Sequence, residues 1–326
     1  MNSEFYKGKN VLVTGGTGLI GKPLVDLLIS LEARVRIASL DAPELANPRA
    51  EFNRVDLTHV DNCLKVTKDI DYVFHLAGIK GSPAMTAQKP ASFFYPTISF
   101  NTHMLEAARR NKVERYLFTS TVGVYSPAEI LQEDNVWKTF PSENDKFAGW
   151  AKRMGELQLE AYRIEYGWKF LNCVRPANVY GPFDNFDPKN SMVIPALINR
   201  AFAGEDPFVV WGDGSAIRDF IFSEDCARGI LQIFEKNPQV PVNLGSGSGI
   251  SIKELVETLS EIMPQKLNVV WDVSKPAGDR MRILDSSRAK SLGFETNITL
   301  RQGLEKTVAW YKDNKKSTGS RYNVFI

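Results

Sequence analysis

Three glycines near the amino terminus have the spacing of a phosphate-binding turn. Gly15, Gly18 and Gly21 follow an apolar run at 10–14, and apolar residues at helical spacing continue over 19–31. Glycines permit a tight turn, and a helix N-terminus presents N–H groups and partial positive charge to a pyrophosphate. A strand, this turn and a helix in succession therefore predict dinucleotide binding. The residues predicted to contact the dinucleotide here are Gly15, Thr17, Gly18, Leu19, Ile20 and Gly21.

The second apolar run ends in residues that would read the adenosine ribose. An acid at this place accepts hydrogen bonds from the ribose hydroxyls and repels a 2′-phosphate, whereas a serine tolerates one. Counting along VRIASLD puts Ser39 there and Asp41 two residues later, where Asp41 is either a ribose ligand or a turn residue. The predicted cofactor is therefore NAD or NADP, with NAD favoured. Asp56 and Leu57 are expected at the adenine edge, unless Asp56 only caps a helix.

Alternating strands and helices must position these residues. Apolar runs typical of strands lie at 10–14, 35–38, 52–55, 72–76, 116–120 and 170–174. Helical periodicity lies at 19–31, 60–68, 99–111 and 146–166. This alternation predicts an α/β fold of the Rossmann type, a doubly wound parallel sheet covered on both faces. Residues 1–175 are expected to form the dinucleotide-binding domain. Residues 176–326 are expected to form a smaller, interleaved substrate-binding lobe that ends in a frayed polar tail from 315.

Composition narrows the function classes. The 326 residues carry 40 Lys and Arg against 38 Asp and Glu, which argues against nucleic acid as the main partner. No apolar run approaches the roughly 18 residues of a membrane span, so a cytoplasmic protein without a membrane partner is expected. Cys63, Cys173 and Cys226 are widely spaced with no CxxC, so they are predicted to be core residues, and no metal site is expected.

Several longer motifs resemble those of the extended short-chain dehydrogenase/reductase family, in particular its nucleotide-sugar epimerases, dehydratases and reductases. The motifs are TGGTGLIG at 14–21, HLAG at 75–78, NTHMLEAARRNKVERYLFTSTVGVY at 101–125, RPANVYGP at 175–182, WGDGSAIRDFIFSED at 211–225 and NLGSGSGISIKEL at 243–255. The nearest branches are GDP-fucose synthase, which DNFDPKNSMVIPAL at 184–197 resembles most, and UDP-glucose 4-epimerase. The resemblance implies an NAD(P)-dependent enzyme, a GDP- or UDP-linked sugar as substrate, and a homodimer. It also places Leu76, Ala77 and Gly78 at the cofactor.

The resemblance assigns catalytic roles, with one departure. In the family a Tyr phenolate takes a proton from the sugar hydroxyl while hydride passes to nicotinamide, and a neighbouring Lys lowers the Tyr pKa. A Ser or Thr hydroxyl holds the reacting oxygen. The matching positions here are Thr121 for the hydroxyl and Lys152 for the lysine, which also binds the nicotinamide ribose. Four residues before Lys152, where the family has Tyr, this chain has Ala148.

Three interpretations of Ala148 remain open from the sequence. The alanine is a deliberate replacement of Tyr that holds a substrate in place, or it is natural and another group takes the proton. Tyr95, Glu143 and a water bound by the lysine are the candidates for that group. The third interpretation is a protein that binds a nucleotide sugar or a dinucleotide without turnover.

The resemblance also restricts the reaction and places the substrate. The positions of the acid and base that invert carbons 3 and 5 hold Gly123 and Met192, and the Asp-Glu pair of 4,6-dehydratases is replaced by Val122 and Gly123. The resemblance therefore implies hydride transfer at one carbinol, carbon 4. Asn178 and Arg218 match residues that hold the substrate diphosphate, for which a planar guanidinium is suited. The other predicted substrate contacts are Ser82, Tyr95, Thr121, Val193, Trp211 and Arg280.

Overall fold

A seven-stranded parallel sheet forms the centre of the molecule. The computed structural model describes residues 2–79, 81, 83–187, 190–275, 278–315 and 321–324. The strand order is β11-β6-β5-β4-β1-β2-β3, and every neighbouring pair is parallel. The strands are β1 (Asn10–Thr14), β2 (Arg34–Ser39), β3 (Glu51–Arg54), β4 (Tyr72–His75), β5 (Arg115–Thr119), β6 (Leu171–Pro176) and β11 (Val242–Leu244). The predicted Rossmann-type α/β fold is confirmed.

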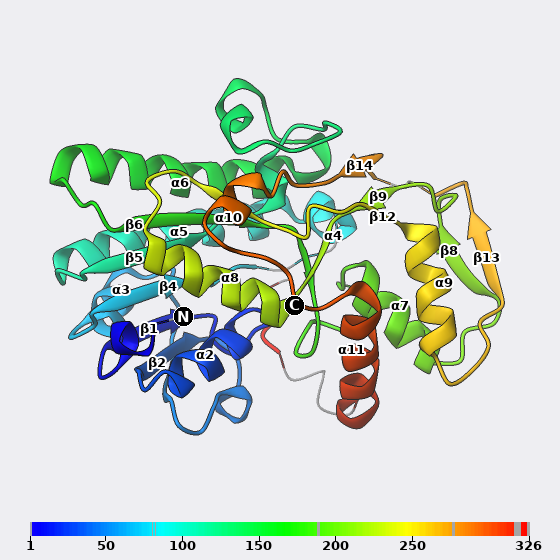
Figure 1. Ribbon diagram of the computed structural model, residues 1–326, viewed down its shortest axis with the longest axis horizontal. Coiled ribbons are helices and arrows are strands. Elements are labelled where there is room, and N and C mark those ends of the chain that lie inside the picture. The colour runs from blue at the N-terminus through cyan, green and yellow to red at the C-terminus, as the bar shows by residue number, and fades with distance from the viewer. Residues whose placement is uncertain are drawn as a thin grey trace.

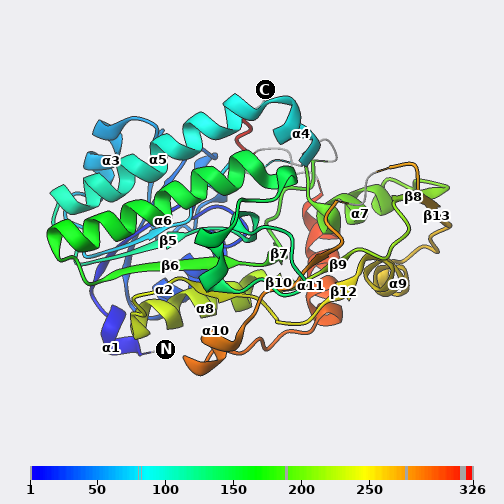
Figure 2. The same ribbon diagram turned by 90° about the horizontal axis from the view of Figure 1, so that it is seen from above.

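Helices cover both faces of this sheet (Figures 1 and 2). One face carries α3 (Val60–Thr67), α5 (Pro90–Arg110) and α6 (Lys146–Tyr166), and the other carries α2 (Gly21–Ser30) and α8 (Ser223–Lys236). Successive residues of β1 point to opposite faces, so Val11 and Val13 pack in the cluster that includes α2, whereas Leu12 packs in the one that includes α5. Burial on both faces explains why the strands are almost continuously apolar.

The second lobe has its own apolar core, at the right of Figure 1. It contains α7 (Val193–Phe202), α9 (Ile252–Ile262), α11 (Leu300–Asn314) and the parallel pair β8 (Phe208–Trp211) and β13 (Val269–Asp272). Smaller strands are β7 (Asn178–Tyr180), β9 (Ile217–Arg218), β10 (Phe220–Phe222), β12 (Ile250–Ser251) and β14 (Met281–Arg282). Because β11 and α8 return to the main sheet, the second half of the chain contributes to both lobes. The boundary at 175/176 stays a prediction.

Short helices connect these elements. They are α1 (Ser3–Tyr6), η1 (Pro43–Leu45), α4 (Pro83–Gln88), η2 (Val122–Val124), η3 (Glu133–Lys138), η4 (Glu143–Asp145) and α10 (Ser287–Ser291). Among the helices of the described ranges, none combines the length and apolar character that crossing a bilayer needs. Cys63, Cys173 and Cys226 are buried and unbonded, as predicted for core residues.

One predicted helix boundary is wrong. The helix expected at 99–111 begins at Pro90 and passes through Pro96. Pro90 lies in the first turn, where the missing N–H costs nothing, whereas Pro96 removes one internal hydrogen bond. The Thr97 hydroxyl donates to the Phe93 carbonyl at 2.7 Å within the same stretch. The other predicted strands and helices agree with the observed bounds to within two residues.

Candidate active site

The glycine turn between β1 and α2 has the geometry of a phosphate cradle. Gly15 has a φ of +68°, a backbone conformation that L side chains rarely adopt, and its carbonyl accepts a 3.0 Å hydrogen bond from the Gly18 N–H. A Cβ on Gly21 would lie 2.1 Å from the Gly15 carbonyl oxygen. Ile20, at the N-cap of α2, provides no side-chain cap for the helix. The turn therefore leaves backbone rather than side chains toward a ligand, which fits a pyrophosphate.

A buried hydrogen-bond chain fixes the end of β4 beside this turn. The Thr14 hydroxyl accepts the N–H groups of Leu76 and Ala77 at 3.1 and 3.0 Å. It therefore donates to His75 Nδ1, 2.8 Å away, and the ring in turn donates from Nε2 to Asn101 Oδ1 at 3.0 Å. Burial and then the charge of Lys152 lower the pKa of His75 to about 3, so the ring is neutral.

Two buried polar atoms near this strand edge are available to bind a ligand. Asn101 Nδ2 and Thr119 Oγ1 have no hydrogen-bond partner among the described residues, although both side chains are buried. The Asn101 side chain is held by its hydrogen bond with His75. Thr119 is the last residue of β5, and its backbone carbonyl accepts a 2.8 Å hydrogen bond from Lys152. Unpaired buried donors are costly, and a bound group or water at this edge satisfies them. The edge thus fits the polar nicotinamide half of a dinucleotide.

The residues assigned to catalysis meet where α6 packs on the turn after β5. Thr121 caps η2, and its hydroxyl oxygen accepts the Gly123 N–H at 3.2 Å. A Cβ on Gly149 would lie 2.4 Å from the Gly123 carbonyl oxygen, so α6 touches this turn with bare backbone. Ala148 precedes that contact and is half-buried. The structure therefore brings Ala148 and the Thr121 turn together, with Lys152 one helical turn further along α6.

Lys152 lies in an unusual electrostatic environment. Burial is the largest influence and lowers the pKa of its ammonium to about 8, against the opposing influence of Cys173 and Glu156. Its Nζ donates to the Thr119 carbonyl and lies 4.9 Å from the centre of the Phe118 ring. A lysine with this pKa exchanges protons near neutral pH, which an exposed lysine does not.

A buried ion pair supports this helix from behind. Arg175 at the end of β6 binds both carboxylate oxygens of Glu156, at 2.9 and 2.6 Å, and both side chains are almost fully buried. The Ser120 hydroxyl donates to the same carboxylate at 2.5 Å, and Arg175 also donates to the Tyr125 hydroxyl at 3.0 Å. The network ties β5, α6 and β6 together directly beneath the Thr121 turn.

The side chains predicted as substitute bases are open to solvent. Tyr95 on α5 is 71% exposed. The Glu143 side chain is 84% exposed and pairs with Lys146 at 3.3 Å. Neither is held against the Thr121 turn by a hydrogen bond that the structure describes.

Two charged residues that were not predicted from the sequence connect the Thr121 turn to the second lobe. Asp145 lies against Gly123, where an added Cβ would be 3.3 Å from its Cβ, and it pairs with Arg282 of β14 at 2.5 Å. Arg282 also pairs with Asp279. Burial and the Arg282 charge lower the pKa of the neighbouring Arg218, which Asp279 and Asp145 oppose. Arg218 of β9 is also the register partner of Arg282 in β14, so the predicted diphosphate ligand lies near the Thr121 turn. The charged residues of GDRMR at 278–282 were the sequence signal from which Arg282 could have been predicted.

The other predicted substrate residues are spread over the second lobe. Asn178 donates its side-chain amide to the Asp219 carbonyl at 2.9 Å, and Val193 begins α7 half-buried. Arg280 is exposed, and Trp211, 56% exposed, is the last residue of β8. Arg280 stands between Asp279, which accepts hydrogen bonds from Ser142 and Asn144, and Arg282, which pairs with Asp145, so its backbone lies close to the start of α6. Ser82 lies outside the described residues.

The predicted adenosine contacts have partners of their own. The Thr17 hydroxyl lies 2.9 Å from the Ser39 hydroxyl and donates to Asp41 at 2.7 Å, so Asp41 faces the glycine turn. Asp56 accepts the Thr58 N–H at 2.9 Å, and since the N-cap of the following helix α3 is His59, Asp56 is not the residue that caps it. Leu57 is buried in the core. The expected fraying of the whole tail is wrong for 321–324, which bind this region through Arg321 and Tyr322.

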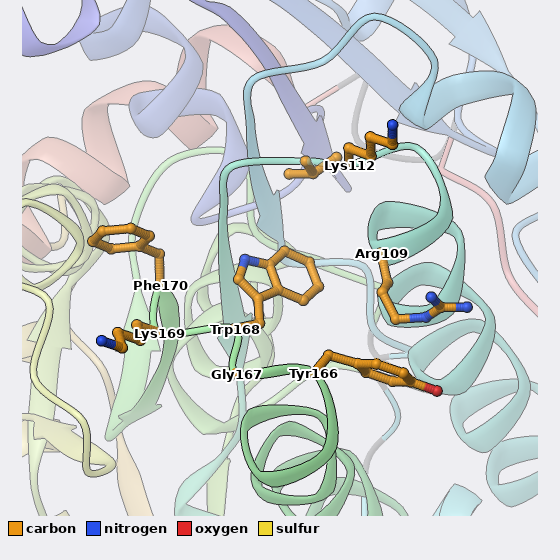
Figure 3. A pocket seen from close by; sticks show the side chains of 8 residues that line it. Arg109, Lys112, Tyr166, Gly167, Trp168, Lys169 and Phe170 are labelled. Carbon is orange, nitrogen blue, oxygen red and sulfur yellow. The ribbon is translucent and has the colours of Figure 1, made fainter.

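Two surface hollows differ in their relation to this site. One, of about 380 Å³, is lined by residues such as Arg109, Tyr166 and Trp168 at the amino ends of β5 and β6 (Figure 3). Ligands of open α/β sheets bind at the carboxyl ends of the strands, so this hollow is on the wrong edge. The other, of about 540 Å³, is lined in part by Ser142, Glu143 and Asp279 beside the start of α6, close to Asp145.

Comparison with known proteins places this geometry in a family. The NAD dependent epimerase/dehydratase family matches residues 11–245. A probable GDP-L-fucose synthase 1 of Oryza sativa subsp. japonica is 31% identical, over 94% of this chain and 93% of its own. A dTDP-4-dehydro-6-deoxy-D-allose reductase of a Streptomyces species is 30% identical, over 97% of this chain and 100% of its own.

Solved structures agree with the sequence relatives. The structure of the UDP-glucose 4-epimerase of Thermotoga maritima with UDP-glucose has a TM-score of 0.84 and 29% identity, covering 94% of this chain and 100% of that one. The predicted resemblance is confirmed, and with it NAD(P) dependence as a property of the family. The chain belongs to the NAD dependent epimerase/dehydratase family.

Proposed function

We propose that this protein is an NAD(P)-dependent epimerase or reductase of nucleotide-diphosphate sugars that transfers hydride at one sugar carbinol, carbon 4. The observation that carries the proposal is the backbone contact of Gly149 with the Gly123 carbonyl. This contact sets Thr121 and the α6 positions 148 and 152 beside one another, at the strand edge that also holds the glycine turn. The relatives named above act on GDP-, dTDP- and UDP-linked sugars.

Each side chain has a defined task in this proposal. Bound NAD or NADP supplies the hydride acceptor or donor. The Thr121 hydroxyl holds the sugar oxygen that loses or gains a proton, and the Lys152 ammonium holds the nicotinamide ribose. Since Ala148 has no acid or base, the proton passes through a water at Lys152, whose pKa of about 8 suits exchange in both directions.

The remaining predicted contacts complete the two binding regions. Those proposed for the dinucleotide are Gly15, Thr17, Gly18, Leu19, Ile20, Gly21, Ser39, Asp41, Asp56, Leu57, Leu76, Ala77 and Gly78. Asn178 and Arg218 hold the diphosphate of a GDP- or UDP-linked sugar, with Val193, Tyr95, Trp211 and Arg280 as further contacts. Because Gly123 and Met192 carry no acid or base, inversion at carbons 3 and 5 does not occur.

A homodimer through α5 and α6 is part of the proposal. Apolar side chains on α6 are exposed at helical spacing, a pattern that marks a protein interface. They are Phe147 (41%), Met154 (37%), Leu157 (45%) and Ile164 (77%). A second copy of the same face, packed as a four-helix bundle, covers them. We place the protein in the cytoplasm.

The test is a coupled binding and turnover assay. The protein is titrated with NADH and NADPH by fluorescence, and then incubated with oxidised cofactor and GDP-, UDP- and dTDP-hexoses while absorbance at the reduced nicotinamide band is followed. We expect the protein to bind a dinucleotide and to reduce the oxidised cofactor slowly as it oxidises at least one nucleotide sugar. If that sugar is epimerised, NMR shows inversion at carbon 4. Binding of neither dinucleotide contradicts the proposal.

A second function is favoured by one residue. Ala148 removes the usual proton acceptor, so the same fold is suited to a sensor that binds a nucleotide sugar or a dinucleotide without turnover. Dinucleotide binding with no turnover of any nucleotide sugar, both as the native chain and after Ala148→Tyr, supports the sensor.

A further inference from the structure

We propose that Arg321, from the carboxyl-terminal segment, determines cofactor specificity by admitting the 2′-phosphate of NADP. The inference rests on the proposed function, since it concerns the dinucleotide site. Figure 1 shows this terminal segment in red beside the blue amino-terminal part of the chain. Nothing in the family motifs predicted that residues 321–324 reach this site.

The contacts place Arg321 at the adenosine-ribose end of the glycine turn. Its Nη1 donates to the Thr17 carbonyl at 3.1 Å and to the Asp41 carboxylate at 3.3 Å. The backbone N–H of Tyr322 donates to the other oxygen of Asp41 at 2.8 Å. The side chains of Arg321 and Asp41 are only 18% and 13% exposed, so the pair is built into the fold. One residue of the turn and the two ribose-reading candidates, Ser39 and Asp41, thus share one hydrogen-bonded cluster with the tail.

The charges around Asp41 and Arg321 determine whether the site accepts a ribose with a 2′-phosphate. Asp41 alone would repel a 2′-phosphate, as an acid after the second strand does in NAD-specific sites. Pairing with Arg321 cancels that charge, and Ser39 occupies the position where the acid normally stands. Asp184 is a second carboxylate that acts on Arg321, and Arg54 adds a second guanidinium, 3.3 Å from the Leu40 carbonyl. The formal charges of Arg321, Arg54, Asp41 and Asp184 add up to zero. Without Arg321, the net charge of the remaining three side chains is negative.

A guanidinium is also the group that binds phosphate best. It offers five N–H donors in a planar fork, which matches two phosphate oxygens. The hydrogen bonds that hold the Arg321 side chain against Thr17 and Asp41 use only its Nη1. The ligand chemistry that fits the cluster is therefore a phosphomonoester on the ribose 2′-oxygen, held by Arg321 with the hydroxyls of Ser39 and Thr17.

The experiment compares NADPH and NADH binding to the full chain. Dissociation constants are measured by fluorescence titration for the native protein, Arg321→Gln, Asp41→Asn and the double variant. Arg301→Gln is the matched control, because Arg301 is an exposed arginine that pairs with Glu261 in the second lobe. We expect Arg321→Gln to weaken NADPH at least about tenfold, the size of one charge-assisted contact, with NADH changed by less than about twofold. Adding Asp41→Asn to Arg321→Gln recovers part of the NADPH affinity, because the repelling carboxylate is gone.

The outcomes separate this inference from the proposed function. Equal losses for both dinucleotides in Arg321→Gln mean that the tail only supports the fold, and equal gains mean that it obstructs the site. Either result, or no change, overturns the role of Arg321 while dinucleotide binding by the native protein stands. If the native protein binds neither NADH nor NADPH, the proposed function and this inference both fall.

Discussion

We expect Ala148→Tyr to supply the proton acceptor that the proposed mechanism lacks at position 148. Position 148 is one helical turn before Lys152 on α6, and residues four apart on a helix have Cβ atoms roughly 5–6 Å apart. At an effective dielectric constant of about 20, a unit charge about 6 Å away is worth about 3 kcal/mol. This corresponds to about two pKa units, so the phenol pKa falls from about 10 to about 8. A general base of this pKa contributes about 10² to 10⁴ in rate.

The assay measures kcat with the nucleotide sugar that binds best, at pH 7, where the Lys152 ammonium is mostly charged, for the native chain, Ala148→Tyr and Ala148→Phe. Phenylalanine adds the same ring without the hydroxyl, so it controls for packing at the α6 contact. We expect a rise in kcat of about 10² to 10⁴ for tyrosine and none for phenylalanine. A gain below about threefold, or an equal gain with phenylalanine, would refute the reasoning that position 148 lacks the proton acceptor.

Three further predictions follow from the same site. Because the pKa of Lys152 is lowered to about 8, its ammonium is lost as the pH rises through that value, so the NADH dissociation constant rises about tenfold from pH 7 to pH 9. Lys152→Gln binds weakly at both pH values, and an equally steep pH dependence in that variant contradicts the assignment. Glu156→Gln leaves its buried arginine partner without a counter-charge and lowers the free energy of unfolding in urea by about 3–5 kcal/mol. Glu261→Gln removes the exposed ion pair with Arg301 and lowers the free energy of unfolding by less than about 1 kcal/mol. Equal losses of stability in the two variants would show that burial of the ion pair does not set the difference. Light scattering should show a monomer for Leu157→Glu on the exposed face of α6 and a dimer for the control Val273→Glu, which is also at an exposed position but in the second lobe. A dimer for both variants argues against an interface through α5 and α6.

Local sequence signals were sufficient for the glycine turn and for six of the seven strands of the main sheet, all but β11. Buried parallel strands are short apolar runs, which can be recognised in a short stretch of sequence. The constraint on Gly15 is its own positive φ, and that on Gly21 comes from the backbone of Gly15 and Gly16, so both glycines also belong to a local pattern. The start of α5 was missed because Pro96 is an unfavourable residue that the surrounding helix nevertheless tolerates.

Contacts between distant segments account for what the sequence did not predict. Arg282 meets Asp145 across 137 positions, and Arg321 meets Asp41 across 280, so neither pairing has a periodic signal. The hydrogen-bond chain from Thr14 through His75 to Asn101 depends on strand order and tautomer. Polar residues such as these reveal their partners only when the fold brings them together, which is why the tail was expected to be frayed.

The most direct test of the central claim is mass spectrometry of the ligands released from the purified native protein, supported by titration with added NADH and NADPH. The proposed function predicts NAD or NADP in the released fraction, or micromolar binding of an added dinucleotide, together with retention of a nucleotide-diphosphate sugar. Release of no dinucleotide, with no binding of either one at millimolar concentration, would contradict it.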